Sequence, residues 1–370
     1  MVSSTADSRK PRILVLIKGL GIGGAERLIS EATPVWSRDE FEYRVAYMLP
    51  WKDQLVEDIE ANHVEVTCVG GTSGLDIRTP WRLRSLIADW QPDLIHAHLP
   101  LSGILARLST SVPTIYTEHN LANSYKQPTR TLNKLTYWQN AAVIAVSEAV
   151  RDSLRDFPGP TPIVVPNGVA ASAHRSGTDV RQELGIGPDT PLIVHVGNIR
   201  PHKGHANLVA ATAYLDATLP DFLVISIGVE KNDGDLDKLT ADARSRGVEH
   251  SIRFLGRRPD AIDFMAAADV VVNPSDVEGL PVTLLEAHSL ARPIVATDVG
   301  GVASIVMDRE TGLLVSPKDP AALAHAIEIA LTSPDAEKWA RSGADLVREH
   351  FSTSAMIEAH ESIYRETLRG

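Results

Sequence analysis

Short apolar runs of strand length alternate with segments of helical periodicity along almost the whole chain. This alternation is typical of βαβ units, in which parallel strands are covered by helices. The runs form two sets, which lie at Arg12–Ile17, Tyr43–Leu49, Val64–Val69, Asp93–His98, Thr114–His119 and Ala142–Ser147, and at Leu192–Gly197, Phe222–Gly228, Ile252–Gly256, Asp269–Asn273, Pro293–Thr297 and Leu313–Ser316. The pattern predicts an α/β protein with two doubly wound parallel sheets.

The length of 370 residues is enough for two domains. A run at 163–169 is followed by a small, polar and aperiodic stretch at 170–179, which we interpret as a linker. We therefore predict an N-terminal Rossmann-like domain at 1–167 and a C-terminal one at 168–349. A final helix, expected at about 352–368 within 350–370, carries Met356, Ile357, Ile363 and Tyr364, and the sequence leaves open which domain it packs on.

The net charge of −11 is uneven, at −1 before Val165 and −10 from there onward. An acidic total argues against nucleic acid as the main partner, because phosphate backbones attract clustered Lys and Arg. Cys68 is the single cysteine, which suits a reducing compartment, and we predict that it is a small core residue. The polar first ten residues and the lack of an apolar run of about 18 residues predict a cytoplasmic protein.

Two carboxylates stand eight positions apart around a turn that opens a helix, Glu278 before it and Glu286 within it. Glu278 follows the strand at 269–273, where ligands of open α/β sheets bind. The turn Gly279-Leu280-Pro281-Val282 has Pro in the first helical turn and free amides that can receive a phosphate. Because carboxylates accept hydrogen bonds from vicinal hydroxyls, we predict one acid for a sugar ring and one for a ribose. The alternative is a solvated acid and a buried cap.

A second loop, Val196–Gly204, also follows a strand and opens a helix, and it carries Asn198, Arg200 and Lys203. Arg offers a bidentate fork and Lys a point charge, so both cations could neutralise a departing nucleoside diphosphate. The alternative is a basic surface loop. We expect His202 to face solvent.

A glycine-rich segment after the first strand, Lys18–Leu28, fits the dinucleotide pattern with Gly19, Gly21 and Gly24. The pattern also needs an acid for the ribose at the end of the second strand, and none is present there, so an NAD-dependent dehydrogenase is disfavoured. The amides of Gly23 and Gly24 could instead meet a phosphate or a sugar. A purely structural turn is the alternative.

His119 ends the fifth strand of the first set and is a candidate contact to the donor sugar, although a lone histidine is more often structural. His96 and His98 lack spaced Cys, Asp or Glu partners, so we interpret them as core or supporting polar groups rather than metal ligands. No Asp-x-Asp stands at a strand end, and we predict neither a metal nor a cofactor. The sequence also lacks a Ser-His-Asp signature, a nucleophile elbow and a P-loop, which argues against hydrolases and nucleotide triphosphatases.

Taken in order, these segments resemble the retaining glycosyltransferases of family 4, a GT-B-fold group of bacterial mannosyl-, glucosyl- and N-acetylglucosaminyltransferases. The resemblance implies two Rossmann-like domains facing across a cleft, with the donor mainly on the second and the acceptor mainly on the first. The final helix of this fold commonly crosses back to the first domain. The matching segments are Gly23–Glu26, Asp93–His98, Glu118–His119, Ala145–Ser147, Pro166–Gly168, the Arg200/Lys203 loop, Phe254–Gly256 and the Glu278/Glu286 pair.

The resemblance also implies roles for individual residues. Donor-sugar hydroxyls are assigned to Glu278 and His119, the ribose to Glu286, the diphosphate to Arg200 and Lys203, and a phosphate contact to the amide of Gly24. One departure is Asn198, where many relatives have Arg. The implied reaction moves a hexosyl group from a UDP- or GDP-linked sugar to a hydroxyl of a glycan, glycolipid or lipid-linked precursor. It retains configuration on one face, without a metal or a protein nucleophile.

Segment 125–138 combines Lys126, Arg130 and Lys134 with aromatic and apolar residues. It could lie peripherally on the inner face of an anionic membrane, or it could be an ordinary helix covering the sheet. Three other functions stay open: a sugar-nucleotide epimerase, a phosphorylase on the same fold, and a non-catalytic nucleotide-sugar binding protein.

Overall fold

The computed structural model describes residues 9–71, 76–170 and 174–369. Its internal contacts divide the chain into two units. Unit 1 runs to Asn167 and resumes at Thr353, and unit 2 runs from Gly168 to Ser352. Each unit contains one all-parallel sheet, so the predicted α/β class with two doubly wound sheets is confirmed.

The sheet of unit 1 has the strand order β3-β2-β1-β4-β5-β6-β7. Successive side chains of a strand point to opposite faces, so residues 14 and 16 of the first strand pack in one apolar cluster with residues 95 and 97 of the fourth. The strands are β1 Arg12–Ile17, β2 Glu42–Tyr47, β3 Glu65–Cys68, β4 Leu94–His98, β5 Thr114–Glu118, β6 Ala142–Ala145 and β7 Ile163–Val164.

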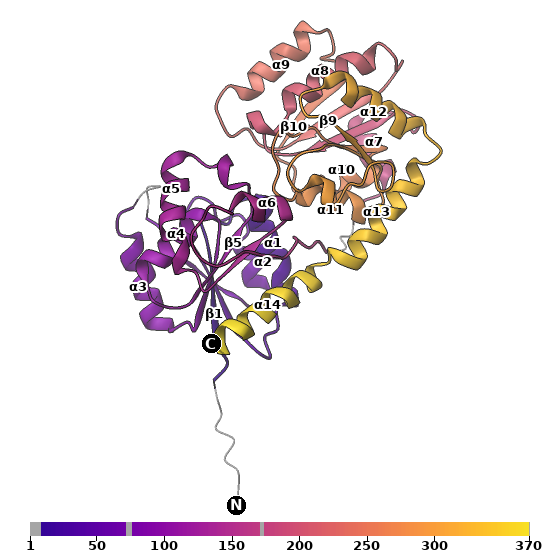
Figure 1. Cartoon of the computed structure of the whole chain (residues 1–370). Helices are drawn as coiled ribbons and strands as arrows, with labels where there is room; N and C mark the ends of the chain where they lie inside the picture. Colours follow the sequence, from indigo (N-terminus) through magenta and orange to yellow (C-terminus); the bar gives the residue numbers. More distant parts are fainter. Residues whose placement is uncertain (1–8, 72–75, 171–173, 370) are drawn as a thin grey trace, which may run out of the picture. The chain divides into compact units, whose positions relative to one another are not determined.

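Helices cover both faces of this sheet (Figure 1). On one face α3, α4 and α5 lie side by side, and on the other α1 packs against the final helix, α14. The helices are α1 Gly24–Ala32, α2 Val56–Ala61, α3 Thr79–Trp90, α4 Pro100–Ser109, α5 Gln127–Thr136, α6 Glu148–Ser153 and α14 Thr353–Arg369, with 3-10 turns η1 Thr33–Val35, η2 Ala122–Ser124 and η3 Tyr137–Gln139.

Unit 2 repeats the scheme with the strand order β10-β9-β8-β11-β12-β13. Its main apolar core lies between the sheet and α8, α9 and α12. The elements are α7 Gly177–Leu184, β8 Leu192–Val196, η4 Pro201–Lys203, α8 His205–Asp216, β9 Leu223–Ile227, α9 Asp235–Ser245, β10 Ile252–Gly256, α10 Ala261–Ala267, β11 Val270–Asn273, α11 Val282–Ser289, β12 Ile294–Thr297, η5 Val302–Ser304, β13 Leu313–Val315, α12 Pro320–Thr332 and α13 Ala336–His350.

In both sheets the strand order reverses once, between β1 and β4 in unit 1 and between β8 and β11 in unit 2. The connections after the two strands at such a point diverge to opposite faces and leave a crevice at the carboxyl ends, where open α/β sheets bind ligands. The predicted site segments follow these strands or their neighbour β5. The fold therefore places them at two crevices, one in each unit.

Several sequence predictions are corrected by the structure. All twelve predicted strands are present, with ends that differ by up to two residues, but β7 was missed in the run at 163–169 that precedes the predicted linker at 170–179. Residues 171–173 of that linker lie outside the described residues, and α7 already begins at Gly177. Cys68 is exposed rather than a core residue, because β3 is an edge strand of the sheet.

Candidate functional site

Two loops meet at the crevice of unit 2, one after β8 and one after β11. The amide of Asp276 donates to the carbonyl of His202 at 2.8 Å and joins them. Gly204, with φ of 70°, lies so close that a Cβ there would stand 1.8 Å from the carbonyl oxygen of Pro274. Glycine is therefore required for the loops to approach each other.

The loops bring Lys203 and Glu278 together. Lys203 Nζ lies 2.7 Å and 2.9 Å from the two carboxylate oxygens of Glu278. The hydroxyl of Ser275 donates to the same carboxylate at 2.7 Å and the amide of Asn273 at 3.4 Å. The Glu278 side chain is 7% exposed, so this buried acid is held in one orientation by one cation and two neutral donors.

The sequence reasoning did not identify Asn273 and Ser275. Both are buried at the end of β11, and the carboxamide oxygen of Asn273 also accepts from the backbone amide of Ser275 at 3.1 Å. The signal was present, because polar residues that end an otherwise apolar strand lie at the ligand-binding edge of the sheet. Their side chains fix the orientation of the Glu278 carboxylate through hydrogen bonds.

The remaining predicted residues of unit 2 lie on the same loops and on α11. Arg200 is exposed, whereas the side-chain oxygen of Asn198 accepts from the amide of Val229 at 3.3 Å and braces the loop after β9. Gly279, Leu280 and Pro281 are buried, with Pro281 at the N-cap of α11 rather than in its first turn, and Val282 is the half-buried first helical residue. Glu286 is buried one turn further along α11. His202 is exposed, as predicted.

In unit 1 the glycine-rich loop leads into α1. Gly23 is the N-cap of this helix and Gly24, exposed, is its first residue. The first amides of a helix have no intrahelical acceptor and point outward, so this end of α1 can meet an anion or a hydroxyl. The predicted contact of the Gly23 and Gly24 amides with a phosphate or a sugar stays a prediction.

His119 follows β5 and pairs with His98 at the end of β4. Nε2 of His119 lies 3.0 Å from Nδ1 of His98, and the two rings are stacked. Burial lowers the pKa of His119 to about 3 and also lowers the pKa of His98 well below its usual value. Both rings are therefore neutral near pH 7, so they can exchange hydrogen bonds with hydroxyls but supply no positive charge.

A third imidazole, His96, links this pair to the final helix. Its Nδ1 lies 2.6 Å from the Tyr364 hydroxyl on α14, and its Nε2 lies 2.7 Å from Oγ1 of Thr117. The surrounding hollow of unit 1 combines these polar groups with apolar side chains of α1 and α14, and it is lined by Val15, Leu28, Ile29, Ala32, Trp36, His96, His98, Thr117, His119, Val146, Val165, Asn167, Met356, Ile357, His360 and Tyr364.

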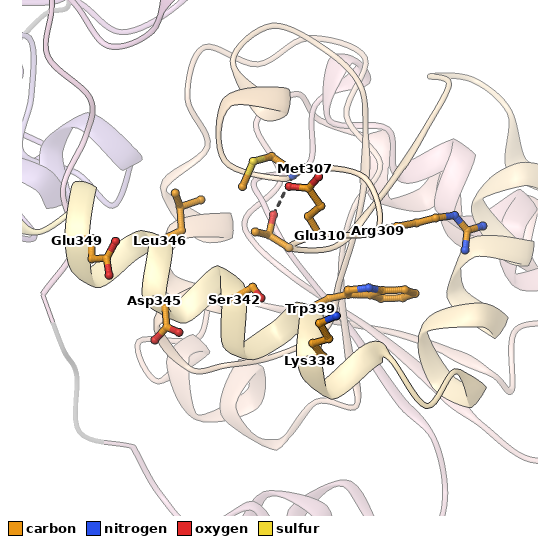
Figure 2. A pocket seen from close by; sticks show the side chains of 10 residues that line it. Met307, Arg309, Glu310, Lys338, Trp339, Ser342, Asp345, Leu346 and Glu349 are labelled. Carbon is orange, nitrogen blue, oxygen red and sulfur yellow. Dashed lines mark hydrogen bonds between the residues drawn. The ribbon is translucent and has the colours of Figure 1, made fainter.

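Figure 2 shows a different hollow, on unit 2, between the turn before β13 and one face of α13. Charges of both signs line it, with Arg309 and Lys338 against Glu310, Asp345 and Glu349. It contains none of the predicted site residues, so the loops after β8 and β11 remain the candidate site.

No group of three or more His, Cys, Asp or Glu side chains in the described part of the chain has the geometry to hold a metal ion. Among the helices of residues 9–71, 76–170 and 174–369, none is long and apolar enough to cross a membrane.

Comparison with known proteins gives the chain its relatives. Residues 22–172 match the family described as Glycosyltransferase Family 4, and residues 177–345 match Glycosyl transferases group 1. A D-inositol 3-phosphate glycosyltransferase of Corynebacterium glutamicum is 33% identical over 307 residues, which are 75% of this chain and 72% of that protein. An alpha-maltose-1-phosphate synthase of Mycolicibacterium smegmatis is 31% identical over 307 residues, or 74% of this chain and 79% of that protein.

Solved structures have the same fold. A sucrose-phosphate synthase from Thermosynechococcus elongatus superposes with a TM-score of 0.82 at 21% identity and covers 96% of this chain and 98% of that one. Anabaena HepE in complex with UDP and glucose gives a TM-score of 0.86 at 20% identity, covering 96% and 100%. Together with the family matches over both units, these similarities show that the chain belongs to glycosyltransferase family 4 and has the GT-B fold.

Proposed function

We propose that this glycosyltransferase moves a hexosyl group, with retention of configuration and without a metal, from a UDP- or GDP-linked sugar to a hydroxyl acceptor. The acceptor we propose is a glycan, a glycolipid or a lipid-linked precursor. The observation that carries the proposal is the pair of Lys203 and Glu278 at the crevice of unit 2. The cation can neutralise the diphosphate of a nucleotide sugar, and the acid can accept hydrogen bonds from the hydroxyls of its sugar.

The pair suggests how a donor is held. Glu278 has two carboxylate oxygens for hydroxyls of the sugar, and Asn273 and Ser275 keep it oriented. Lys203, which contacts this acid, lies on the same loop as the exposed Arg200, so both cations can face a diphosphate. We assign the ribose to Glu286 and a phosphate contact to the first amides of α11. The complex of HepE with UDP and glucose supports a nucleoside-diphosphate hexose as the donor.

The mechanism that we propose needs positioning and charge stabilisation. Negative charge grows on the diphosphate as the glycosidic bond breaks, and Arg200 and Lys203 stabilise it. The leaving phosphate oxygen accepts the proton of the acceptor hydroxyl on the same face, so no side chain is assigned as a nucleophile. His119, a neutral imidazole supported by His98, orients a sugar hydroxyl, and the amide of Gly24 contributes to a phosphate contact.

Donor binding tests the first half of the proposal. Calorimetry with UDP, GDP, ADP and their hexose conjugates should give binding to one nucleotide, weakened at least tenfold by Glu286→Ala and by Lys203→Met. Lys238→Met is the matched control, because Lys238 is an exposed lysine of the same unit that pairs with Asp235 on α9. Equal binding by wild type and all three variants would remove Lys203 and Glu286 from the donor site.

The chemistry is tested by product analysis. With the donor so identified, proton NMR of the glycosylated acceptor should show the anomeric configuration of the donor, and the rate should be unchanged by EDTA. An altered sugar nucleotide without acceptor would indicate an epimerase, and phosphate-dependent release of a sugar phosphate a phosphorylase. Nucleotide binding without turnover of any acceptor would indicate a binding protein.

The acceptor side includes a proposed membrane contact through α5. Leu132, Leu135 and Trp138 are exposed and lie with Lys134 on this helix and the turn after it, whereas Lys126 is the N-cap and Tyr137 is fully buried. Flotation with vesicles containing anionic lipid should recover the wild type but not Leu135→Glu. Tyr214→Glu, at an exposed aromatic residue of unit 2, is the control. Equal recovery of the wild type and Leu135→Glu, or recovery of neither, would argue for a purely structural helix.

A further inference from the structure

Glu118 is a buried acid next to His119 that the proposed function does not use. It is the last residue of β5 and is fully buried. Side chains alternate along a strand, so Glu118 points to the face covered by α4 and α5, whereas His119 and Thr117 face the hollow described above. The acid therefore lies behind the site, not in it.

Hydrogen bonds alone hold this carboxylate. One oxygen accepts from the Tyr125 hydroxyl at 2.6 Å and from the amides of His119 and Asn120 at 3.1 Å and 3.3 Å. The other oxygen accepts from the hydroxyl of Tyr116. No Lys or Arg of the described chain forms an ion pair with it. The acid thus binds the main chain at the two positions that follow β5.

The network extends into the neighbouring helices. The Asn120 side chain donates to the Tyr125 hydroxyl at 2.9 Å, just before α5. Asn133 of α5 donates to the Tyr116 hydroxyl at 3.3 Å and accepts from Arg107 of α4 at 2.6 Å. Both ends of the loop at 119–125 are therefore tied to Glu118, one through the amides of His119 and Asn120 and the other through the Tyr125 hydroxyl. Tyr116 links the same acid to Asn133 of α5.

Burying the carboxylate of Glu118 costs free energy. Burial raises the pKa of Glu118 to about 7, against the hydrogen bonds from Tyr116 and Tyr125 and from the two amides. The other ionisable groups near the acid are Tyr137 and Arg107. A buried polar network can often be replaced by apolar side chains of similar shape at no loss of stability, so its presence beside a site residue favours a role in geometry.

We propose that Glu118 is a positioning residue for glycosyl transfer, which acts by holding the main chain of His119 and Asn120 and by tying the far end of this loop back to β5 through Tyr125. The inference rests on the proposed contact of His119 with substrate. It follows that the position of His119, and with it the pair of neutral imidazoles His119 and His98, depends on an acid that does not contact the sugar.

A double-mutant cycle tests the link between the two residues. Glu118→Gln keeps the shape but loses the second acceptor oxygen, and it should lower kcat/KM for transfer about 10- to 100-fold, the range for a small misplacement of a site group. The Kd for the nucleotide should not change, because Glu118 forms no hydrogen bond with the residues assigned to the nucleotide, which are Arg200, Lys203, Glu286 and the amide of Gly24. In a His119→Ala background, Glu118→Gln should cause no further loss of kcat/KM. Losses that multiply in the double variant would overturn the proposal.

A matched pair of hydroxyl deletions provides a test that needs no activity. Tyr125→Phe removes a donor to Glu118, whereas Tyr137→Phe removes a buried hydroxyl that has no hydrogen-bond partner. Amide hydrogen exchange in 119–125 should accelerate at least tenfold in Tyr125→Phe and Glu118→Gln but not in Tyr137→Phe. Unchanged exchange, or acceleration spread over all of unit 1, would refute the proposal.

The two tests separate the inference from the proposed function. If the wild type transfers no sugar, the proposed function fails, and the exchange measurement still decides whether Glu118 positions the loop. If the wild type is active and Glu118→Gln is equally active, the proposed function stands and the inference fails.

Discussion

Breaking the contact between Lys203 and Glu278 should destabilise unit 2 by an amount that the structure sets. Removing one partner of a buried ion pair typically costs about 3–5 kcal/mol, because the other charge is left uncompensated. Here the Lys203 side chain is 27% exposed and Glu278 7% exposed, and Ser275 and Asn273 still donate to the acid. We therefore expect Lys203→Met to lower the free energy of unfolding of unit 2 by about 2 kcal/mol.

The two partners should not behave independently. Glu278→Gln keeps an acceptor for Ser275 and leaves Lys203 able to reach water, so about 1 kcal/mol is expected. In the double variant no charge is left buried and unpaired, so its loss should be about 1–2 kcal/mol rather than the sum. The coupling between the two positions should thus be about 1–2 kcal/mol.

A probe specific to unit 2 is needed, since two units need not unfold in one step. Trp339 is the only tryptophan between positions 168 and 352, so its resonance in fluorotryptophan-labelled protein reports this unit during urea titration. Lys238→Met, which breaks an exposed pair, should leave the midpoint unchanged. Additive losses, or a Lys203→Met protein as stable as the wild type, would show that the acid is compensated by other groups.

Three further results are expected. Burial lowers the pKa of His360 from 6.5 to about 4, so as the pH falls the unfolded state is protonated first, and each pH unit below about 6 lowers the free energy of unfolding by up to roughly 1.4 kcal/mol. His360→Phe should remove this slope from the stability profile of unit 1 between pH 6 and 4.5, and an unchanged slope would contradict a buried neutral ring. Glu361→Ala removes the acceptor of the Tyr43 hydroxyl and of the amide and hydroxyl of Ser37. The free energy of unfolding of unit 1 should fall by about 2–4 kcal/mol, and its melting temperature should fall by more than in Tyr43→Phe. Cys68 is exposed on an edge strand, so it should react with a thiol reagent in the folded protein and Cys68→Ser should be within about 0.5 kcal/mol of wild type, whereas a protected thiol would contradict the edge position.

The strands could be predicted from the sequence because parallel sheets bury both faces, and a strand then appears as a short, continuous apolar run. The strand β7 escaped because Ile163–Val164 is too short for any periodicity and is followed by Pro166. Cys68 was misplaced for a different reason. The valines at 64, 66 and 69 made its run look apolar although Glu65 and Thr67 interrupt it, and only the strand order shows that β3 is an edge strand.

The sequence could place the candidate site residues to the level of the loops that carry them, since the carboxyl ends of the strands fix those loops. Which side chains touch could not be read from the sequence. Lys203 and Glu278 are 75 positions apart, and their contact depends on the close approach allowed by Gly204. For Glu118 a signal did exist: an acid within the predicted strand at 114–119 needs donors if it is buried, and Tyr116 and Tyr125 stand close by in the chain.

The two crevices differ in charge, and under the proposed function this difference has a chemical meaning. The loops of unit 2 place Arg200 and Lys203 in a segment of the chain whose net charge is −10, so these cations form a local exception. In unit 1 the histidines at the ends of β4 and β5 have lowered pKa values because they are buried, and they stay neutral near pH 7. In glycosyl transfer from a nucleoside diphosphate, negative charge grows on the leaving group, whereas the sugar and the acceptor are recognised through hydroxyls. A second cationic site would compete for the diphosphate. Neutral imidazoles bind hydroxyls without that competition, so burial of the histidines serves selectivity even though it costs stability in acid.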